Sequence, residues 1–369
     1  MPHSADGVLT PRRLNRTLLE RQMLLRRRSM RPLDAVERLV GLQAQVPRDP
    51  YIALWSRLDG FRPETLSDAL RERRAVRMGL MRGTLHLVTA ADAVGLRPVM
   101  GAVMRRVFES QTAFRRNLDG LDPDQLAEAA TEVLEERPRT RAELAPLLGE
   151  RFPGRDPASL AWGAAYLLPL VQVTPRGLWR TSGPSAFTTA ETWLGTPIAT
   201  DTTPDGVVLR YLAAFGPSTV GDVQAWSGLT GMRAVLHRLR SQLRTFRDER
   251  GRELVDVHDA PLSDPDVPAP TRFLPEYDNG FLAHADRSRI VSEDVRKRMF
   301  KAGWGQVLVD GFVAARWKID ERATETTLSV EPHRALSRTE REEISDEGDA
   351  LVTWLTGRTA GRVRFLVPP

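Results

Sequence analysis

Hydrophobic residues recur at helical spacing in three successive segments of the chain, and each segment closes with two short, strand-like runs around a turn. The first segment contains expected helices at Leu14–Arg28, Leu33–Gln43, Tyr51–Leu58 and Glu64–Glu72 and strands at Ala75–Leu80 and Thr84–Val88. The second contains helices at Asp124–Glu136, Arg141–Leu148 and Ala158–Leu168 and a hairpin at Val171–Thr181. The third contains helices at Val207–Phe215, Thr219–Ser227 and Met232–Leu243 and a hairpin at Arg244–Val257.

This repeated order of helices and a closing hairpin predicts three tandem winged-helix motifs. In such motifs the third helix typically enters a DNA groove and the hairpin, or wing, contacts the backbone. Each expected wing carries an arginine near its tip, namely Arg82, Arg176 and Arg250. Any one unit could serve only as scaffold or dimerisation surface, but the repeated arginine favours DNA binding.

The chain changes character after the third hairpin. Ala260–Pro270 contains four prolines and is expected to be an extended linker. Beyond it we expect strands at Phe281–Ala283, Gln306–Val309, Phe312–Trp317, Thr326–Val330 and Arg362–Val367 and helices at Ser292–Phe300 and Ser337–Thr356. Asp310-Gly311, between apolar runs, is a strong hairpin signal.

The expected fold class is therefore α+β and mainly helical, with a small mixed α/β domain after the winged helices. The expected domains are residues 11–120 (the first winged helix and a following helix), 121–200, 201–258 and the C-terminal 271–369. A chain of 369 residues fits two or three hydrophobic cores better than one.

Charge is dominated by arginine. The net charge is +5, and only Lys297, Lys301 and Lys318 are lysines among the 53 basic residues, so 50 are arginines. The isoelectric point is about 10.0. A GC-rich genome favours arginine codons, but guanidinium groups also bind phosphate in bidentate fashion. Bulk charge therefore permits a nucleic-acid partner without deciding between these explanations.

Several common kinds of site are not expected. The chain contains no cysteine, and its six histidines, His3, His86, His237, His258, His284 and His333, are scattered, so we expect neither disulfides nor a metal site. It has no phosphate-binding glycine loop and no nucleophile elbow. Without a signal peptide or an apolar span, a cytoplasmic protein associated with the nucleoid, and with no membrane partner, is the expectation.

Gln43-Ala44-Gln45 lies where the second helix should end, before two prolines that exclude helix. On an extended segment, residues i and i+2 project to the same side, so the two amides would converge on one point. The alternative is that both glutamines cap the helix end. From the residues alone, the capping interpretation is favoured.

Two further polar stretches allow structural and functional interpretations. In Arg82-Gly83-Thr84-Leu85-His86-Leu87, Thr84 and His86 alternate with leucines, so one strand face is polar and faces either DNA or solvent. His284-Ala285-Asp286-Arg287 is either a loop salt bridge or part of a site.

Four runs of residues carry a resemblance to a known family: Leu42-Gln43-Ala44-Gln45-Val46-Pro47, Arg82-Gly83-Thr84-Leu85-His86-Leu87, Leu274-Pro275-Glu276-Tyr277-Asp278-Asn279 and His284-Ala285-Asp286-Arg287-Ser288-Arg289-Ile290. In these runs the chain resembles the AlkZ/YcaQ-type bacterial DNA glycosylases. The match in order and spacing runs from about Leu14 to Val367. The YcaQ branch has aspartate at the second polar position of the first motif. Gln45 therefore favours the AlkZ branch.

The resemblance implies three winged helices that form a concave basic cleft for duplex DNA. It implies excision of bulky N7-alkylguanine adducts, including interstrand cross-links formed by alkylating natural products, in repair and self-resistance. Gln43 and Gln45 correspond to the family's two catalytic glutamines. A hairpin that enters the DNA is expected at Val307–Trp317, with Asp310 and Gly311 at its turn.

N7 alkylation makes guanine a cationic leaving group, so two amides that position water and stabilise charge can suffice. All three lysines lie far in sequence from the glutamines, so no Schiff-base lyase step is expected. The expected enzyme is monofunctional, uses no cofactor or metal, and needs duplex DNA but no protein partner. A non-catalytic winged-helix regulator or architectural protein is the alternative.

Overall fold

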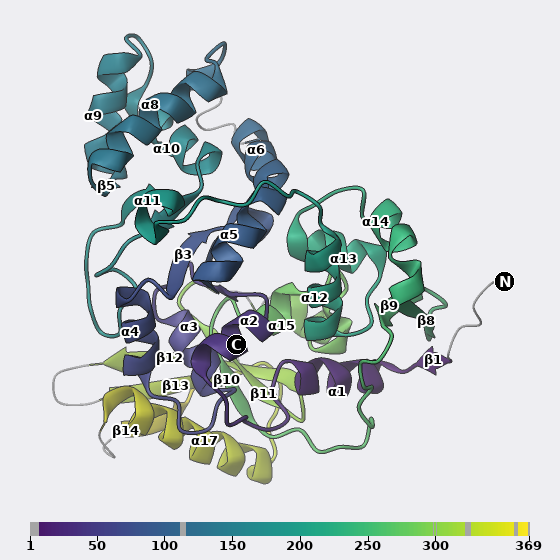
Figure 1. Ribbon diagram of the computed structural model, residues 1–369. Helices are drawn as coiled ribbons and strands as arrows, with labels where there is room; N and C mark the ends of the chain where they lie inside the picture. The colour runs from purple at the N-terminus through teal and green to yellow at the C-terminus, as the bar shows by residue number, and fades with distance from the viewer. Residues whose placement is uncertain are drawn as a thin grey trace.

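Three β-sheets organise the chain, and helices lie between and around them (Figure 1). The computed structural model describes residues 7–110, 116–297, 299, 301–321, 326–357 and 361–367. In this part of the chain the sheets have the strand orders β2-β4-β3-β6-β7-β5, β1-β8-β9 and β10-β11-β12-β13-β14. The fold is a mixed α/β arrangement in which the N-terminal strand β1 pairs with β8 of the third segment, so one sheet joins distant parts of the sequence.

Prolines mark the helix starts of the first segment. Its elements are β1 (Val8–Leu9), α1 (Pro11–Arg21), α2 (Pro32–Arg38), β2 (Leu42–Gln43), α3 (Asp49–Trp55), α4 (Pro63–Arg71), β3 (Ala75–Gly79), the 3₁₀ turn η1 (Met81–Gly83) and β4 (Leu85–Thr89). All four α-helices have a proline in their first turn, where its missing N–H costs nothing. The expected helices and hairpin of this segment are therefore present, with shifted ends.

One expected helix end is wrong in a way that matters. The helix expected to reach Gln43 ends at Arg38, and Gln43 lies in a strand. Gly41, with φ of 87°, makes the turn between them, and a Cβ there would stand 2.7 Å from Val88 Cγ1. The close approach of this turn to β4 ends the helix and starts the strand.

The second segment joins the first through a shared sheet. It comprises α5 (Ala90–Val99), α6 (Gly101–Ser110), η2 (Arg116–Leu118), α8 (Pro123–Glu136), β5 (Arg139–Thr140), α9 (Arg141–Arg151), α10 (Pro157–Leu167), β6 (Leu170–Gln172), β7 (Ala186–Thr189) and α11 (Ala190–Leu194). Strand β6 pairs with β3 and with β7. The hairpin expected at Val171–Thr181 was wrong in its second strand, because the chain returns only at Ala186.

The third segment follows the expected order closely. It contains α12 (Asp205–Phe215), α13 (Val220–Ser227), α14 (Met232–Arg238), η3 (Arg240–Gln242), β8 (Leu243–Asp248) and β9 (Glu253–Val257). Thr219 caps α13 through a reciprocal capping box with Asp222. The third helix is shorter than expected and ends at Arg238.

The C-terminal part is a sheet covered by one long helix. Its elements are β10 (Arg272–Leu274), α15 (Asn279–Leu282), η4 (Arg287–Arg289), α16 (Glu293–Arg296), β11 (Gly305–Val309), β12 (Phe312–Glu321), β13 (Thr326–Pro332), α17 (Arg338–Thr356) and β14 (Gly361–Phe365). The hairpin at Asp310-Gly311 is confirmed. The strand expected at Phe281–Ala283 is wrong, since Asp278 caps a short helix there. The helix expected over Ser292–Phe300 is only α16, and Phe300 lies outside the described residues.

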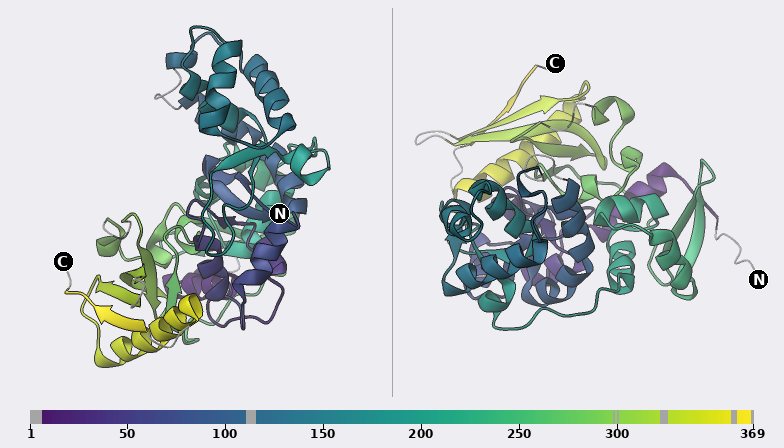
Figure 2. Two further views of the ribbon diagram at one scale, coloured as in Figure 1. Left: turned by 90° about the vertical axis from the view of Figure 1, so that its left-hand side faces the viewer. Right: turned by 90° about the horizontal axis from the view of Figure 1, so that it is seen from above.

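The C-terminal sheet shares its core with the first segment. Figure 2 shows α8–α10 and this sheet at opposite ends of the molecule, with the first segment between them. One hydrophobic cluster includes Leu54 of α3, Phe273 of β10 and Val330 of β13. An ion pair also connects the first segment to the C-terminal part. The Arg57 guanidinium donates to both carboxylate oxygens of Asp278 at 2.8 Å, and both side chains are fully buried.

We expect Asp278→Asn to lower the free energy of unfolding, measured in urea, by about 3–5 kcal/mol, because it leaves the Arg57 charge buried without a counter-ion. Asp34→Asn is the matched control, since it breaks a pair with Arg31 that lies on the surface. It should leave unfolding unchanged. Equal stability of the two variants would contradict a bracing role for the buried pair.

Candidate active site

Gln43 ends the short edge strand β2, which lies beside the β3–β4 hairpin, and Gln45 lies in the bend that follows. Gln43 is aligned with His86 of β4, and the Ala44 N–H donates to Leu85 O at 2.7 Å. The cap of α2 is Leu39, so Gln43 and Gln45 do not cap that helix. The capping interpretation is therefore wrong, and the expected extended conformation is confirmed at Gln43 only, since Gln45 lies in a bend.

Gln43 is held by an arginine from the turn of the hairpin. Its side chain is buried, and Oε1 accepts a hydrogen bond of 2.7 Å from Arg82 Nη2. The other terminal nitrogen of Arg82 donates to Trp226 O in α13 at 2.6 Å. Arg82 has a left-handed backbone with φ of 57°. The arginine expected at the wing tip is thus directed back into the protein, where it connects the first and third segments.

Burial changes the electrostatics of this arginine. Desolvation, followed by repulsion from Arg287, lowers the pKa of Arg82 to about 10. Both of its described hydrogen-bond acceptors are neutral oxygens. Gln43 therefore lies next to a buried positive charge.

Gln45 is exposed, and a second arginine fixes the backbone beside it. Its Oε1 accepts from Leu85 N at 3.3 Å. Arg77, buried in β3, donates to Ala44 O at 2.6 Å and to the side chain of Gln172. The sequence analysis missed Arg77 and Gln172, because nothing in a strand pattern shows that an arginine between buried neighbours supports a site.

His86 and Thr84 do not form an exposed polar face. His86 is 2% exposed, and its Nδ1 lies 2.9 Å from Thr84 O. Burial, followed by the charge of Arg82, lowers the pKa of His86 to about 3, so the imidazole is neutral at physiological pH. Thr84 is half-buried and its hydroxyl donates to Met81 O. The solvated-face interpretation is wrong for His86.

A pocket of about 240 Å³ adjoins Gln45. Its polar and charged walls include Arg77, Arg141, Gln172, Arg176 and Ser185, and its aromatic walls include Trp162, Tyr166 and Phe187. Arg176 is thus the one of the three expected wing arginines that shares a pocket wall with a candidate catalytic glutamine.

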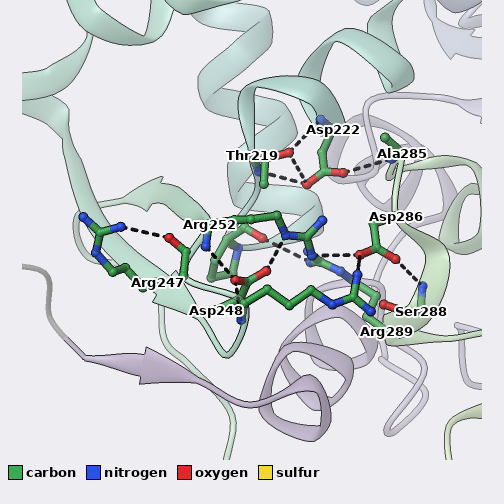
Figure 3. A network of polar contacts seen from close by, with 12 residues as sticks. Thr219, Asp222, Arg247, Asp248, Arg252, Ala285, Asp286, Ser288 and Arg289 are labelled. Carbon is green, nitrogen blue, oxygen red and sulfur yellow. Dashed lines mark hydrogen bonds and ion pairs between the residues drawn. The ribbon is translucent and has the colours of Figure 1, made fainter.

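The remaining expected DNA contacts lie elsewhere. Arg250 pairs with Asp286 at 3.2 Å, and Arg252 bridges Asp286 and Asp248 (Figure 3). Although burial opposes the shift, hydrogen bonds from Ser288 and Arg252 lower the pKa of Asp286 to about 2. The β8–β9 hairpin is therefore held by ion pairs to the loop that contains His284 and Asp286.

The Asp310-Gly311 turn packs against α1. Arg12 and Arg16 bind the Asp310 carboxylate, and Asn15 Nδ2 donates to Gly311 O at 2.8 Å. A Cβ on Gly311 would stand 2.6 Å from Asn15 Oδ1. The expected inserting hairpin has its tip against protein, away from the Gln43 strand.

A family model described as DNA glycosylase AlkZ-like matches residues 36–354 of the chain. The chain belongs to the AlkZ-like DNA glycosylase family. A curated relative from Streptomyces sahachiroi, described as an interstrand DNA cross-link repair glycosylase, is 25% identical over 334 residues, or 82% of this chain and 85% of the relative. The solved structure of S. sahachiroi DNA glycosylase AlkZ has a TM-score of 0.79 at 21% identity and covers 97% of this chain and 100% of that chain.

The AlkZ-like assignment confirms the resemblance drawn from the motifs. The chain is a DNA glycosylase, rather than the non-catalytic regulator considered as the alternative. The other motifs of this AlkZ-like chain hold neighbouring segments in place through hydrogen bonds. Asn279 Nδ2 donates to Gly41 O at 2.7 Å, just before the Gln43 strand. Arg289 Nη1 donates to Pro217 O, and Ala285 N to Asp222.

Two searches of the described residues gave negative results. No group of three or more histidine, cysteine, aspartate or glutamate side chains is placed to hold a metal ion within this part of the AlkZ-like chain. None of its helices is long and apolar enough to cross a membrane.

The buried imidazole makes stability depend on pH. Because His86 has a pKa of about 3 when folded and 6.5 ordinarily, the unfolded chain binds its proton first, and stability falls as pH drops from 6.5 towards 3. We expect His86→Asn to remove up to about 1.4 kcal/mol of this loss per pH unit. Urea unfolding at several pH values measures the slope.

The other buried titratable groups contribute equally to the pH slope of the wild type and of each variant, so their contributions cancel when the slopes are compared. These groups include Asp49, whose pKa burial raises to about 7 and whose contribution has the opposite sign. His237→Asn is the control, because that side chain is exposed. A slope that His86→Asn leaves unchanged would show that the imidazole takes up its proton in the folded state.

Proposed function

We propose that this glycosylase hydrolyses the N-glycosidic bond of bulky N7-alkylguanine adducts in duplex DNA, including interstrand cross-links. Gln43 and Gln45 act as its catalytic amides. The observation that carries the proposal is that Gln45 lines a pocket while Gln43, two residues earlier at the end of β2, is fixed by Arg82. The name of the S. sahachiroi relative supports cross-links as substrates.

The chemistry requires little from the protein. Water attacks C1′ of the deoxyribose, the C1′–N9 bond breaks, and its electron pair neutralises the cationic purine. Water gives up one proton to solvent, so the products are neutral 7-alkylguanine and an abasic site. A positioned water and a few oriented dipoles suffice for such an activated bond. Neutral lesions, which lack this leaving group, should resist the enzyme.

The contacts of Gln43 assign it a donor role. A guanidinium only donates hydrogen bonds, so the amide oxygen must face Arg82 and the Nε2 group faces away. Nε2 then donates to the departing purine or to the attacking water. Gln45 is exposed at the pocket, and its Oε1 has a second lone pair besides the one that accepts from Leu85 N, so this amide accepts a hydrogen bond from water and orients it.

The three segments would lie along DNA as winged helices with a concave basic cleft, within the domain limits 11–120, 121–200, 201–258 and 271–369. Arg176, which lines the pocket, is the arginine we retain as a DNA contact. Arg82 and Arg250 have partners inside the protein, and the Asp310-Gly311 turn contacts α1. An enzyme that acts on duplex DNA would work at the nucleoid, in the cytoplasm.

We also propose that the reaction needs neither metal nor a lyase step. Lys301 and Lys318 lie about 5 Å from the ring of Trp304, and Lys318 belongs to β12 of the C-terminal sheet; neither lines the pocket beside Gln45. Incubation with a duplex that carries 7-alkylguanine should release the free base and leave an alkali-labile abasic site. EDTA should not reduce the rate, and borohydride should trap no covalent complex.

The same assay separates the possible outcomes. Release of base with a borohydride-trapped complex would contradict the monofunctional mechanism alone. No release from several adducts, with DNA still bound, would contradict the proposed substrate. Binding to undamaged duplex should weaken steeply with salt, as for any protein that tracks phosphates.

Gln43→Glu tests the donor role directly. The carboxylate keeps an oxygen for Arg82 but has no N–H, so we expect the single-turnover release rate to fall about 100-fold, as for loss of an oriented donor. The release rate of Gln43→Ala should fall by as much, while its DNA affinity stays within twofold of the wild type. If Gln43→Glu matched or exceeded the wild type, Gln43 would be acting as a base.

A double-mutant cycle tests whether Arg82 acts through Gln43. Arg82→Met should slow release in the wild-type background and add nothing in the Gln43→Ala background. Its DNA affinity and unfolding should be measured in parallel, because Arg82 also binds Trp226. Additive losses would mean that Arg82 only supports the fold.

A further inference from the structure

The pocket beside Gln45 extends from the candidate catalytic strand to helices of the second segment. Gln45, in the bend after β2, and Trp162 of α10 are both part of its wall. Its volume of about 240 Å³ exceeds the roughly 150 Å³ of a cavity that holds benzene. A group larger than one ring can therefore enter it.

The charges of the pocket disfavour a cationic guest. Arg77, Arg141 and Arg176 line it, and none of the described lining residues is a carboxylate. Burial, followed by the charge of Arg176, lowers the pKa of Arg77 to about 10. The cationic purine itself is thus a poor occupant.

The guanidiniums are also poorly arranged for a phosphate. Arg77 already donates to Ala44 O and Gln172, and Arg176 donates to Gly183 O. A phosphate needs several convergent N–H groups that it does not share with protein oxygens.

Aromatic rings supply the alternative means of binding. The Arg141 guanidinium lies 3.7 Å from the centre of the Trp162 ring and 5.6 Å from that of Phe187. Trp162 is 37% exposed, unusually open for so large an apolar side chain. We call this group of three side chains the Arg141–Trp162 shelf. Planar surfaces of this kind bind uncharged aromatic groups by stacking.

We infer that the Arg141–Trp162 shelf binds an uncharged aromatic substituent carried on the N7 atom of the damaged guanine, while the purine stays at the glutamines. This inference rests on the proposed function and specifies its substrate class. A tethered substituent reaches the shelf without the base being flipped into a closed pocket, which a bulky adduct resists. The pocket then selects lesions by their appendage.

The test compares three defined lesions in one duplex sequence: 7-methylguanine, 7-benzylguanine and 7-benzylguanine with a charged aminomethyl group on its ring. Single-turnover release rates are measured for the wild type and Trp162→Ala. We expect Trp162→Ala to slow release of 7-benzylguanine about tenfold, the scale of one lost stacking contact, and to leave 7-methylguanine within twofold. The wild type should release the charged derivative more slowly than 7-benzylguanine.

Trp193→Ala is the matched control. Arg73 lies 4.2 Å over the Trp193 ring, so the variant removes the same kind of arginine–tryptophan contact at a place that does not line the pocket. It should not change the preference between lesions. Anisotropy of the labelled duplexes gives affinities that need no catalysis, and circular dichroism checks that Trp162→Ala is folded.

Several outcomes would overturn the inference. Equal losses on methyl and benzyl lesions would assign the shelf to an unstacked DNA base or to the fold. No loss on either lesion, or equal release of the charged derivative, would remove the shelf from substrate selection. If the wild type releases none of the lesions, the proposed function fails. The measured affinities then test the shelf separately: if Trp162→Ala prefers the 7-benzylguanine duplex over the 7-methylguanine duplex as strongly as the wild type does, the shelf does not bind the substituent.

Discussion

The arrangement of the candidate site depends on a half-buried guanidinium whose described hydrogen-bond acceptors are both neutral. Arg82 is partly removed from water and donates to Trp226 O and to the side-chain oxygen of Gln43. Burying a charge is costly, and only strong, well-aligned hydrogen bonds offset that cost. These two bonds attach the β3–β4 turn of the first segment to α13 of the third, and they direct the Gln43 amide oxygen towards Arg82. A structural constraint and a chemical one therefore coincide in one residue.

The family motifs meet around the strand that this arginine supports. Asn279 holds the turn at Gly41, and Arg77 holds the carbonyl between the two glutamines. The buried Arg57–Asp278 pair fixes the segment from which Asn279 comes. The motifs far from the glutamines in sequence thus act mainly by positioning. This explains how an enzyme can present two weak amides with the rigidity that catalysis by orientation demands.

The structure also adds an explanation for the arginine content. Codon bias and phosphate binding were the two explanations considered from the sequence. Arg16, Arg57 and Arg77 are among the largest fully buried side chains, and each donates to protein oxygens from another part of the chain. Much of the positive charge therefore connects the segments, and fewer wing arginines are left for DNA than the sequence suggested. Arg141 and Arg176, both half-buried, line the pocket beside Gln45.

The sequence by itself determined whatever is encoded over a few residues: helix starts at prolines and capping boxes, and the Asp310-Gly311 hairpin. The order of its motifs was enough to identify the family. Only the tertiary structure decided where side chains such as Arg82 end and that β7 returns late to a sheet shared by two segments. The physical reason is distance along the chain. A cap or turn is stabilised by neighbours within four residues, whereas Arg82 binds an oxygen 144 residues away that no local spacing records.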